Sequence, residues 1–165
     1  MKKALLVFLL FIPVLLFSQV PEIPDHSLQD IAMVSWLTGY LPNGSFYDGP
    51  VILFNPSITN QVGPLLSSFF RAHEYGHIHH NHLQKRYFSM NIYNFQWMSS
   101  VYEIEADSYA THQLIQNNQI AAVKAAYMWF KGVQPFKNSL MHPAGIERAR
   151  NIYFISSQYG INLDY

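Results

Sequence analysis

Apolar positions recur at steps of three and four along most of the chain, which is the pattern of amphipathic helices. The longest such stretch carries Leu66, Phe69 and Phe70 on one broad face. Ser27 is placed to cap an earlier helix that Gly39 would end. Pro143 stands where the first turn of a last helix is expected. The predicted helices cover about residues 27–39, 63–84, 98–116, 119–131 and 143–157.

The pattern predicts little β structure. The β-branched and aromatic run Val51–Phe54, stopped by Pro56, is typical of a strand. Turn-forming residues fill 40–50, an irregular aromatic loop is expected over 87–96, and a further loop over 132–142. We therefore predict an α+β fold that is mostly helical, with one small sheet.

The beginning of the chain differs from the rest. Lys2 and Lys3 precede an apolar run from Ala4 to Phe17, and Ser18 follows. This order is typical of a secretory signal peptide over residues 1–18. A membrane span needs about 20 apolar residues, so cleavage is favoured over the alternative of an uncleaved anchor. The mature domain, residues 19–165, is expected to be exported, periplasmic or secreted, with no stable membrane span.

Composition narrows the function classes. Ten Lys and Arg balance ten Asp and Glu, which argues against a nucleic-acid partner. The absence of Cys excludes disulfides, thiol catalysis and thiolate zinc sites. Eight His is a high number for 165 residues. Five of them lie within residues 73–82, inside and just after the long apolar helix.

The segment from His73 to His77 reads H-E-x-x-H. Positions four apart on a helix lie almost above one another, so both imidazoles can bind one zinc ion. Glu74 would then stand beside the metal, where a general base for an attacking water is needed. The alternative is a helix with surface histidines and a salt-bridging Glu. The apolar surroundings of the motif count against it, because unpaired polar groups are costly there.

A second motif, E-x-E-A-D, supplies a third ligand from the helix predicted over 98–116. Glu103 and Asp107 are four apart and share a face, so one can bind the metal while the other supports a ligand His. Glu105 points away and is read as a solvated or structural carboxylate. Ala106 leaves room for two helices to approach closely. The alternative is an ordinary acidic helix face.

Together, H-E-x-x-H and E-x-E-A-D resemble the motifs of gluzincin metallopeptidases of the CAAX-prenyl-protease, HtpX and BepA-like family. His142-Pro143 with Arg148 six residues after the His resembles a third family element. The resemblance covers about residues 50–155. It implies a zincin-like (mini-gluzincin) fold with an active-site helix, a small sheet with an edge strand, and C-terminal helices. The chain lacks the family's membrane helices and helical-repeat extension, so membrane substrates are not carried over.

The resemblance also implies roles. One catalytic zinc ion would be held by His73, His77 and Glu103, with Glu74 as the general base. His142 would stabilise the transition state or, alternatively, occupy the open zinc position and keep the enzyme latent.

Two further residues are expected to support this site from behind. Asp107 is expected to fix the tautomer of a ligand His, and Arg148 to anchor the His142 loop through a carboxylate. The main chain of residues 51–54 is expected to pair with an extended substrate.

The remaining histidines are interpreted more modestly. His79, His80 and His82 form either a second, weaker metal site or a solvated helix end, and the second interpretation is favoured because they cannot all share one face. His112 and His26 are read as incidental.

The preferred function is an exported zinc endopeptidase acting on a protein or peptide. The alternatives are a catalytically silent protein-binding module of the same fold and a His-rich zinc-binding protein. The sequence leaves the oligomeric state open.

Overall fold

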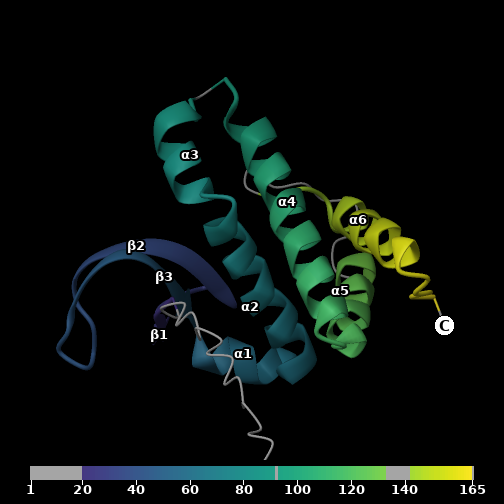
Figure 1. Cartoon of the computed structure of the whole chain (residues 1–165), viewed down its shortest axis with the longest axis horizontal. Helices are drawn as coiled ribbons and strands as arrows, with labels where there is room; N and C mark the ends of the chain where they lie inside the picture. The colour runs from purple at the N-terminus through teal and green to yellow at the C-terminus, as the bar shows by residue number, and fades with distance from the viewer. Residues whose placement is uncertain (1–19, 92, 133–141, 165) are drawn as a thin grey trace, which may run out of the picture.

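The computed structural model describes residues 20–91, 93–132 and 142–164. Its elements form a small sheet followed by six helices, so the predicted mostly helical α+β class is confirmed. The sheet lies on one side of the central helix α2, and α4, α5 and α6 lie on the other (Figure 1). The predicted signal peptide, and all of the predicted loop 132–142 except its two ends, lie outside the described residues.

The sheet has the strand order β1-β3-β2. β1 (Glu22–Pro24) runs parallel to β3 (Phe46–Phe54), and β2 (Ala32–Tyr40) pairs antiparallel with β3 over nine residues. The strand predicted at Val51–Phe54 is therefore the second half of β3, and the first half occupies part of the predicted turn region. Only the segment between Tyr40 and Phe46 forms the turn, where the Leu41 amide donates to the Ser45 carbonyl at 2.9 Å.

The helix predicted over 27–39 is wrong, because most of this segment is β2. Ile31, Val34 and Leu37 have helical spacing, but residues 32–40 instead pair along their whole length with 46–54. Ser27 caps no helix either. Its amide and hydroxyl both donate to the Asp25 carboxylate, at 2.8 and 2.6 Å, in a turn before β2.

The single helix predicted over 63–84 corresponds to α2 (Pro64–His79) and the beginning of a separate helix, α3 (His82–Ser89), and a short helix that was not predicted, α1 (Pro56–Val62), precedes them. The breaks fall at residues with positive φ, Gly63 at 84° and Asn81 at 56°. Such a φ is incompatible with a continuing right-handed helix. The aromatic segment 87–96 is also more regular than expected, since α3 continues to Ser89 and α4 begins at Phe95.

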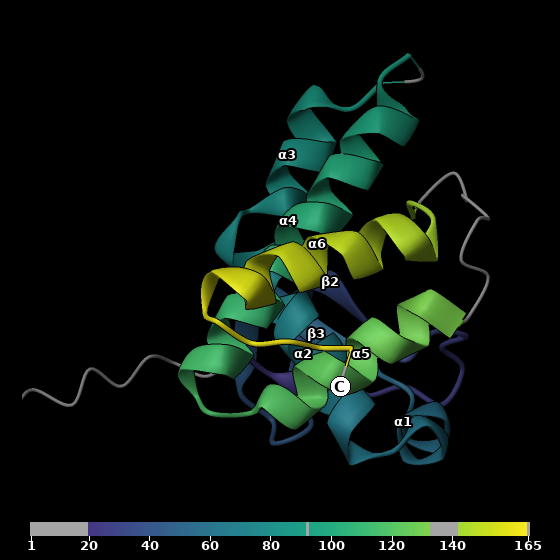
Figure 2. The same ribbon diagram turned by 90° about the vertical axis from the view of Figure 1, so that its right-hand side faces the viewer.

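The later helices lie close to their predicted ranges: α4 (Phe95–Gln116), α5 (Ile120–Gly132) and α6 (Gly145–Gln158). Pro143 lies before the α6 N-cap residue Ala144, so its predicted place in the first turn is wrong. Figure 2 shows α6 crossing over α4. Among the described residues, no helix is both long enough and apolar enough to cross a membrane.

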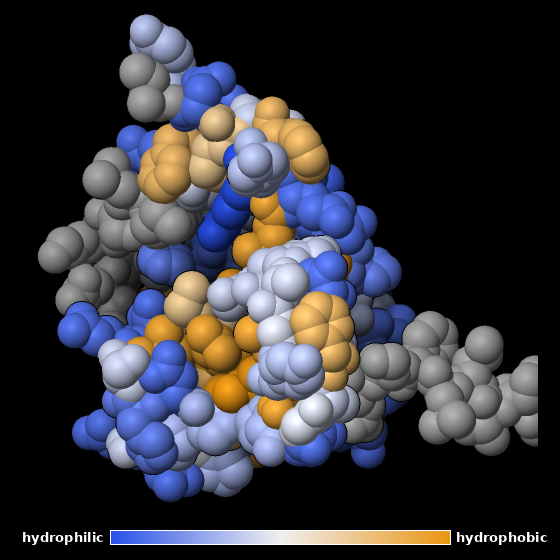
Figure 3. Space-filling view, turned by 90° about the vertical axis from the view of Figure 1, so that its left-hand side faces the viewer, coloured by the Kyte–Doolittle hydropathy of each residue, from blue (hydrophilic) through white to orange (hydrophobic). Residues whose placement is uncertain are grey.

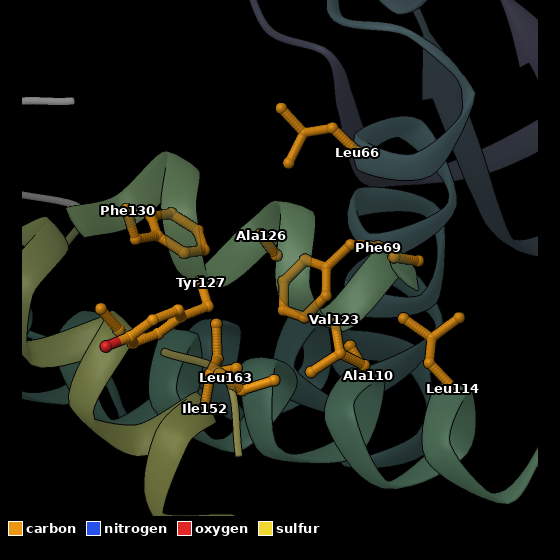
Figure 4. Close-up of a cluster of buried hydrophobic side chains, with 12 residues drawn as sticks. Leu66, Phe69, Ala110, Leu114, Val123, Ala126, Tyr127, Phe130, Ile152 and Leu163 are labelled. Carbon is orange, nitrogen blue, oxygen red and sulfur yellow. The ribbon is translucent and has the colours of Figure 1, made fainter. Parts of the chain in front are cut away.

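The main hydrophobic core lies among α2, α4, α5 and α6 (Figure 4). Phe69 of α2 and Val123 of α5 are completely buried in it, and Ile152 of α6 closes it from the opposite side. Each fully buried side chain of this size contributes about 1.5–3 kcal/mol to folding. This core fixes α2 and α4 against each other, and these two helices carry the H-E-x-x-H and E-x-E-A-D motifs.

The two motif helices meet at Gly76, the fourth residue of H-E-x-x-H. A Cβ added to Gly76 would lie 2.9 Å from both the Cα and the carbonyl oxygen of Ala106. Only glycine fits this contact without moving a backbone. The close approach expected at Ala106 is therefore present, and it brings the facing side chains of α2 and α4 together.

Candidate metal centre

Three buried side chains from α2 and α4 converge and could hold one metal ion: His73, His77 and Glu103. The two histidine Nε2 atoms are 3.0 Å apart. They lie 3.3 and 3.4 Å from the two carboxylate oxygens of Glu103. In a tetrahedral zinc site with bonds of about 2.0–2.1 Å, ligand atoms lie about 3.4 Å apart. The spacing of the three ligands therefore fits a zinc ion.

Protonation states in this cluster suit a cation. Burial would raise the pKa of Glu103, but hydrogen bonds with His142, His73 and His77 hold it well below its ordinary value. Burial lowers the pKa of His77 to about 4, so its ring is neutral at pH 7. At His73 burial is outweighed by the hydrogen bonds to Asp107 and Glu103, which raise its pKa to about 10. Metal binding to the His73 ring must therefore release a proton.

His73 is supported from behind by a buried ion pair. Its Nδ1 lies 2.8 Å from Asp107 Oδ1. Arg148 of α6 donates to both oxygens of Asp107, each at 2.7 Å, and its guanidinium carbon lies 4.1 Å from the centre of the Phe130 ring. Burial opposes ionisation of Asp107, yet the charge and hydrogen bonds of Arg148 hold its pKa below its ordinary value. The ionised Asp107 accepts a hydrogen bond from the Nδ1–H group of His73, and Nε2 of the same ring faces the ligand cluster.

Glu74 stands beside the three ligands without belonging to them. It is 6% exposed, and burial raises its pKa to about 7. The main chain of Val34 in β2 hydrogen-bonds its carboxyl group. A carboxylate with a pKa near neutrality can both take up and release a proton under physiological conditions, which is the property of a general acid–base group.

A cavity of about 430 Å³ opens over this cluster. Figure 3 shows the hollow on this face of the molecule, with hydrophilic residues at its depth and apolar residues around it. Its lining includes Met33 and Val34 of β2 on one side and Phe130 of α5 on the other, with Glu74 and His77 between them. The cavity is therefore bounded by the sheet, and its floor carries the ligand cluster.

The strand beside the cavity is β2. Residues 51–54 belong to β3, which pairs with β1 on one side and with β2 on the other. Their predicted role in pairing with a substrate is therefore wrong, because their main chain is already occupied. Among the described residues, β2 pairs only with β3. The sheet has its other edge at β1, but β2 is the edge strand that lines the cavity, so an extended chain bound beside the cluster would pair with β2.

His142 lies next to the ligand cluster. Its Nδ1 is 3.0 Å from Glu103 Oε2, and about half of its side chain is exposed to solvent. The structure thus places His142 beside the Glu103 oxygen that also lies near Nε2 of His73. Arg148, predicted to anchor its loop through a carboxylate, contacts the carboxylate of Asp107 and approaches Glu103 to 3.7 Å.

The structure also brings two residues to the site that local patterns do not indicate. Arg86 of α3 lines the cavity, with a guanidinium nitrogen 3.5 Å from Glu103 Oε1. His82 is 1% exposed and lies 2.8 Å from His77, so its predicted place at a solvated helix end is wrong. The break at Asn81 turns both residues back toward the site. The one sequence signal that could have indicated the break is Asn81 itself, because Asn adopts left-handed backbone more readily than most residues and often ends a helix.

His82 also belongs to a second group that could hold a metal ion, together with His80 and Glu105. The ring of His79 packs against Tyr109, and His112 is 2.9 Å from the Tyr159 hydroxyl.

Comparisons with family models, with curated proteins and with solved structures find no match to this chain.

Proposed function

We propose that the protein is an exported zinc endopeptidase of zincin-like fold, as its resemblance to gluzincin metallopeptidases implies. The observation that carries the proposal is the position of Glu74, a buried carboxyl group with a pKa near 7, beside a buried cluster of two histidines and a carboxylate. Two His and one Glu are a common ligand set of catalytic zinc, and a fourth position stays open in such sites. A protein that only stored metal would not require a general base at this point.

The residues of the cavity suggest how a peptide would be hydrolysed. Zinc held by His73, His77 and Glu103 would polarise a water and lower its pKa towards about 7. Glu74 would take a proton from the water that attacks the scissile carbonyl, and would then deliver this proton to the leaving nitrogen. His142, at the rim of the cluster, is placed to donate a hydrogen bond to the developing oxyanion.

The outer edge of β2 supports a polypeptide as the substrate. Residues 29–34 lie along the cavity, and an extended chain added to this edge would run past Glu74. Main-chain hydrogen bonds to an edge strand give affinity with little dependence on side chains. We propose unfolded or extended segments of proteins outside the cytoplasm as the substrate class, in keeping with the predicted signal peptide.

The test compares the exported, purified protein with its Glu74→Gln variant. Zinc content is measured by elemental analysis, and cleavage is measured with fluorescently labelled unfolded casein. The variant should keep one zinc per chain and lose about 10²–10⁴-fold of the cleavage rate. Glu147→Gln, an exposed carboxylate of α6, is the matched control and should leave both quantities unchanged. A zinc-loaded wild-type protein that cleaves neither casein nor a peptide library would contradict the proposal.

One alternative has a specific observation in its favour. The second group, His80, His82 and Glu105, suits a His-rich zinc-binding protein. That function requires two zinc ions per chain and does not require Glu74. The zinc stoichiometry of the wild-type protein therefore separates it from the peptidase.

A further inference from the structure

The two ligand histidines are supported in different ways. His73 Nδ1 contacts the buried carboxylate of Asp107 at 2.8 Å. Within the part of the chain that the structure describes, no carboxylate contacts Nδ1 of His77, which instead lies 2.8 Å from Nδ1 of His82. His82 Nε2 in turn lies 2.8 Å from Glu105 Oε2. A chain of hydrogen bonds thus runs from the second ligand to a carboxylate that is 42% exposed.

Metal binding at His77 would fix which atom donates and which accepts in both of these hydrogen bonds. The Nε2 atoms of both ligand histidines face Glu103, so a metal binds there and the remaining proton of a neutral His77 ring sits on Nδ1. Two nitrogen atoms share one proton in a hydrogen bond, so Nδ1 of His82 must be the acceptor. The proton of His82 then sits on Nε2, where it donates to the carboxylate of Glu105.

Packing holds His82 in the position that this arrangement needs. Its ring stacks on Tyr102 of α4, with the centroids 4.3 Å apart and the planes inclined by 15°. The ring of His80 also stacks on the ring of His82, with the centroids 5.4 Å apart and the planes again inclined by 15°. The left-handed backbone at Asn81 reverses the chain after α2, which brings the first residue of α3 back to His77.

From this geometry we infer that His82 and Glu105 are positioning residues, which orient His77 toward the metal as Asp107 and Arg148 orient His73. The inference deepens the proposed function and rests on it, because it requires metal at His73, His77 and Glu103. Hydrogen-bonded partners of this kind typically change metal affinity by 10–100-fold when they are removed.

The same geometry argues against an independent second metal site. A metal held by His80, His82 and Glu105 would need the Nε2 lone pair of His82. When His77 binds metal, that nitrogen carries the proton donated to Glu105. A second ion would have to break the hydrogen bond between His77 and His82 or displace a further proton from His82. We therefore expect one zinc ion per chain.

The first test replaces His82 with Phe, which keeps a ring against Tyr102 and removes both nitrogen atoms. Zinc affinity is measured by competition with a chromogenic chelator, and folding is checked by circular dichroism. We expect zinc affinity to fall 10–100-fold in His82→Phe and by less in Glu105→Gln, whose amide oxygen can still accept from Nε2. His80→Phe is the matched control, because it keeps the ring that stacks on His82 and removes only nitrogen atoms of the second group. It should change the affinity less than about twofold.

The second test uses the wild-type protein, so it does not depend on the folding of a variant. In the zinc-loaded protein, ¹⁵N spectra of the imidazole rings should show His82 protonated at Nε2 and unprotonated at Nδ1. The reverse tautomer, two zinc ions per chain, or an unchanged affinity in a folded His82→Phe protein would overturn the inference. These results are separable from failure of the proposed function, which is the absence of cleavage by a protein that binds one zinc.

Discussion

Each side of the cleft, the helical side and the sheet side, contains an ion pair, and the two pairs differ in how deeply they are buried. On the helical side, Arg148 and Asp107 form a two-point pair whose side chains are 7% and 0% exposed. On the sheet side, Arg71 of α2 reaches Glu22 of β1 at 2.7 Å, and these side chains are 60% and 26% exposed. A buried pair cannot lose one partner without leaving a charge out of water, whereas an exposed pair is replaced by solvent.

The same difference extends to packing. The main core cluster is formed by the helices and by the C-terminal Leu163. In contrast, the outer half of the β2–β3 hairpin exposes large side chains, with Trp36 49%, Tyr40 75% and Phe46 63% exposed. The proposed metal ligands are therefore carried by the densely packed side, and the edge proposed to accept substrate belongs to the side that can adjust at lower cost.

The largest effect is expected from Arg148→Met. Met retains the apolar packing on Phe130 but removes the Arg partner of Asp107, whose carboxylate stays buried with its contact to His73. Loss of one partner of a buried ion pair typically costs about 3–5 kcal/mol. The free energy of unfolding, measured in urea by circular dichroism, should fall by about this amount. Zinc affinity should fall as well, because Asp107 would no longer be fixed against His73.

Arg71→Met is the matched control for that variant. It removes a pair of the same chemistry on the sheet side, where exposed pairs are worth about 0.2–1 kcal/mol. Its unfolding free energy should decrease by no more than this, with zinc affinity unchanged. Equal losses in the two variants would show that the two sides of the cleft do not differ in the way described.

A medium effect is expected from Gly76→Ala at the contact of α2 with α4. The added methyl would lie 2.9 Å from backbone atoms of Ala106, so the helices must separate. Overpacking of this kind typically costs about 1–3 kcal/mol, and here it would also move His73 and His77 away from Glu103. Both unfolding free energy and zinc affinity are the measurements. Gly132→Ala, where an added Cβ meets no described atom within 4 Å, should change neither appreciably.

The helical side was largely predictable from sequence because its signals are local. The spacing of four in His73–His77 and in Glu103–Asp107 places each pair on one helix face regardless of the rest of the fold. The ranges of α4 and α5 follow from the same periodicity. Periodicity alone does not predict that the two motifs converge. That expectation rested on the set of two His and one Glu and on the resemblance to gluzincin metallopeptidases.

The sheet side and the turn after α2 were not predictable in the same way. Residues 32–40 show apolar spacing that also suits a helix, and only their pairing with 46–54 makes them a strand. Local spacing contains no information about that partner. The position of His82 depends on the left-handed backbone at Asn81, which separates α3 from α2. A continuous helix would place His82 on a different face from His77, whereas the break brings the two rings together.

The smallest effect is expected at Asp48, in the exposed half of the hairpin. Its Oδ1 accepts hydrogen bonds from Thr38 Oγ1 at 2.8 Å and from Trp36 Nε1 at 2.9 Å, and Thr38 lies directly opposite it. These two hydrogen bonds, with that from Thr38 the larger contribution, hold the pKa of Asp48 below its ordinary value of 3.8. A folded-state pKa below the unfolded one adds stability above about pH 3.8, which is lost as the pH falls through the folded value.

Thr38→Val should therefore move the Asp48 pKa up toward 3.8, as followed by the carboxyl carbon shift in an NMR titration. Trp36→Phe should move it in the same direction by less. Thr59→Val is the control and should leave the Asp48 pKa unchanged, because the Thr59 hydroxyl donates to the carbonyl of Asn55, the N-cap residue of α1. Zinc affinity should stay the same in all three variants, because none of the three residues belongs to α2 or α4, which carry the proposed ligands. If Asp48 titrates identically with and without the Thr38 hydroxyl, the hydrogen bond between these two side chains is wrong.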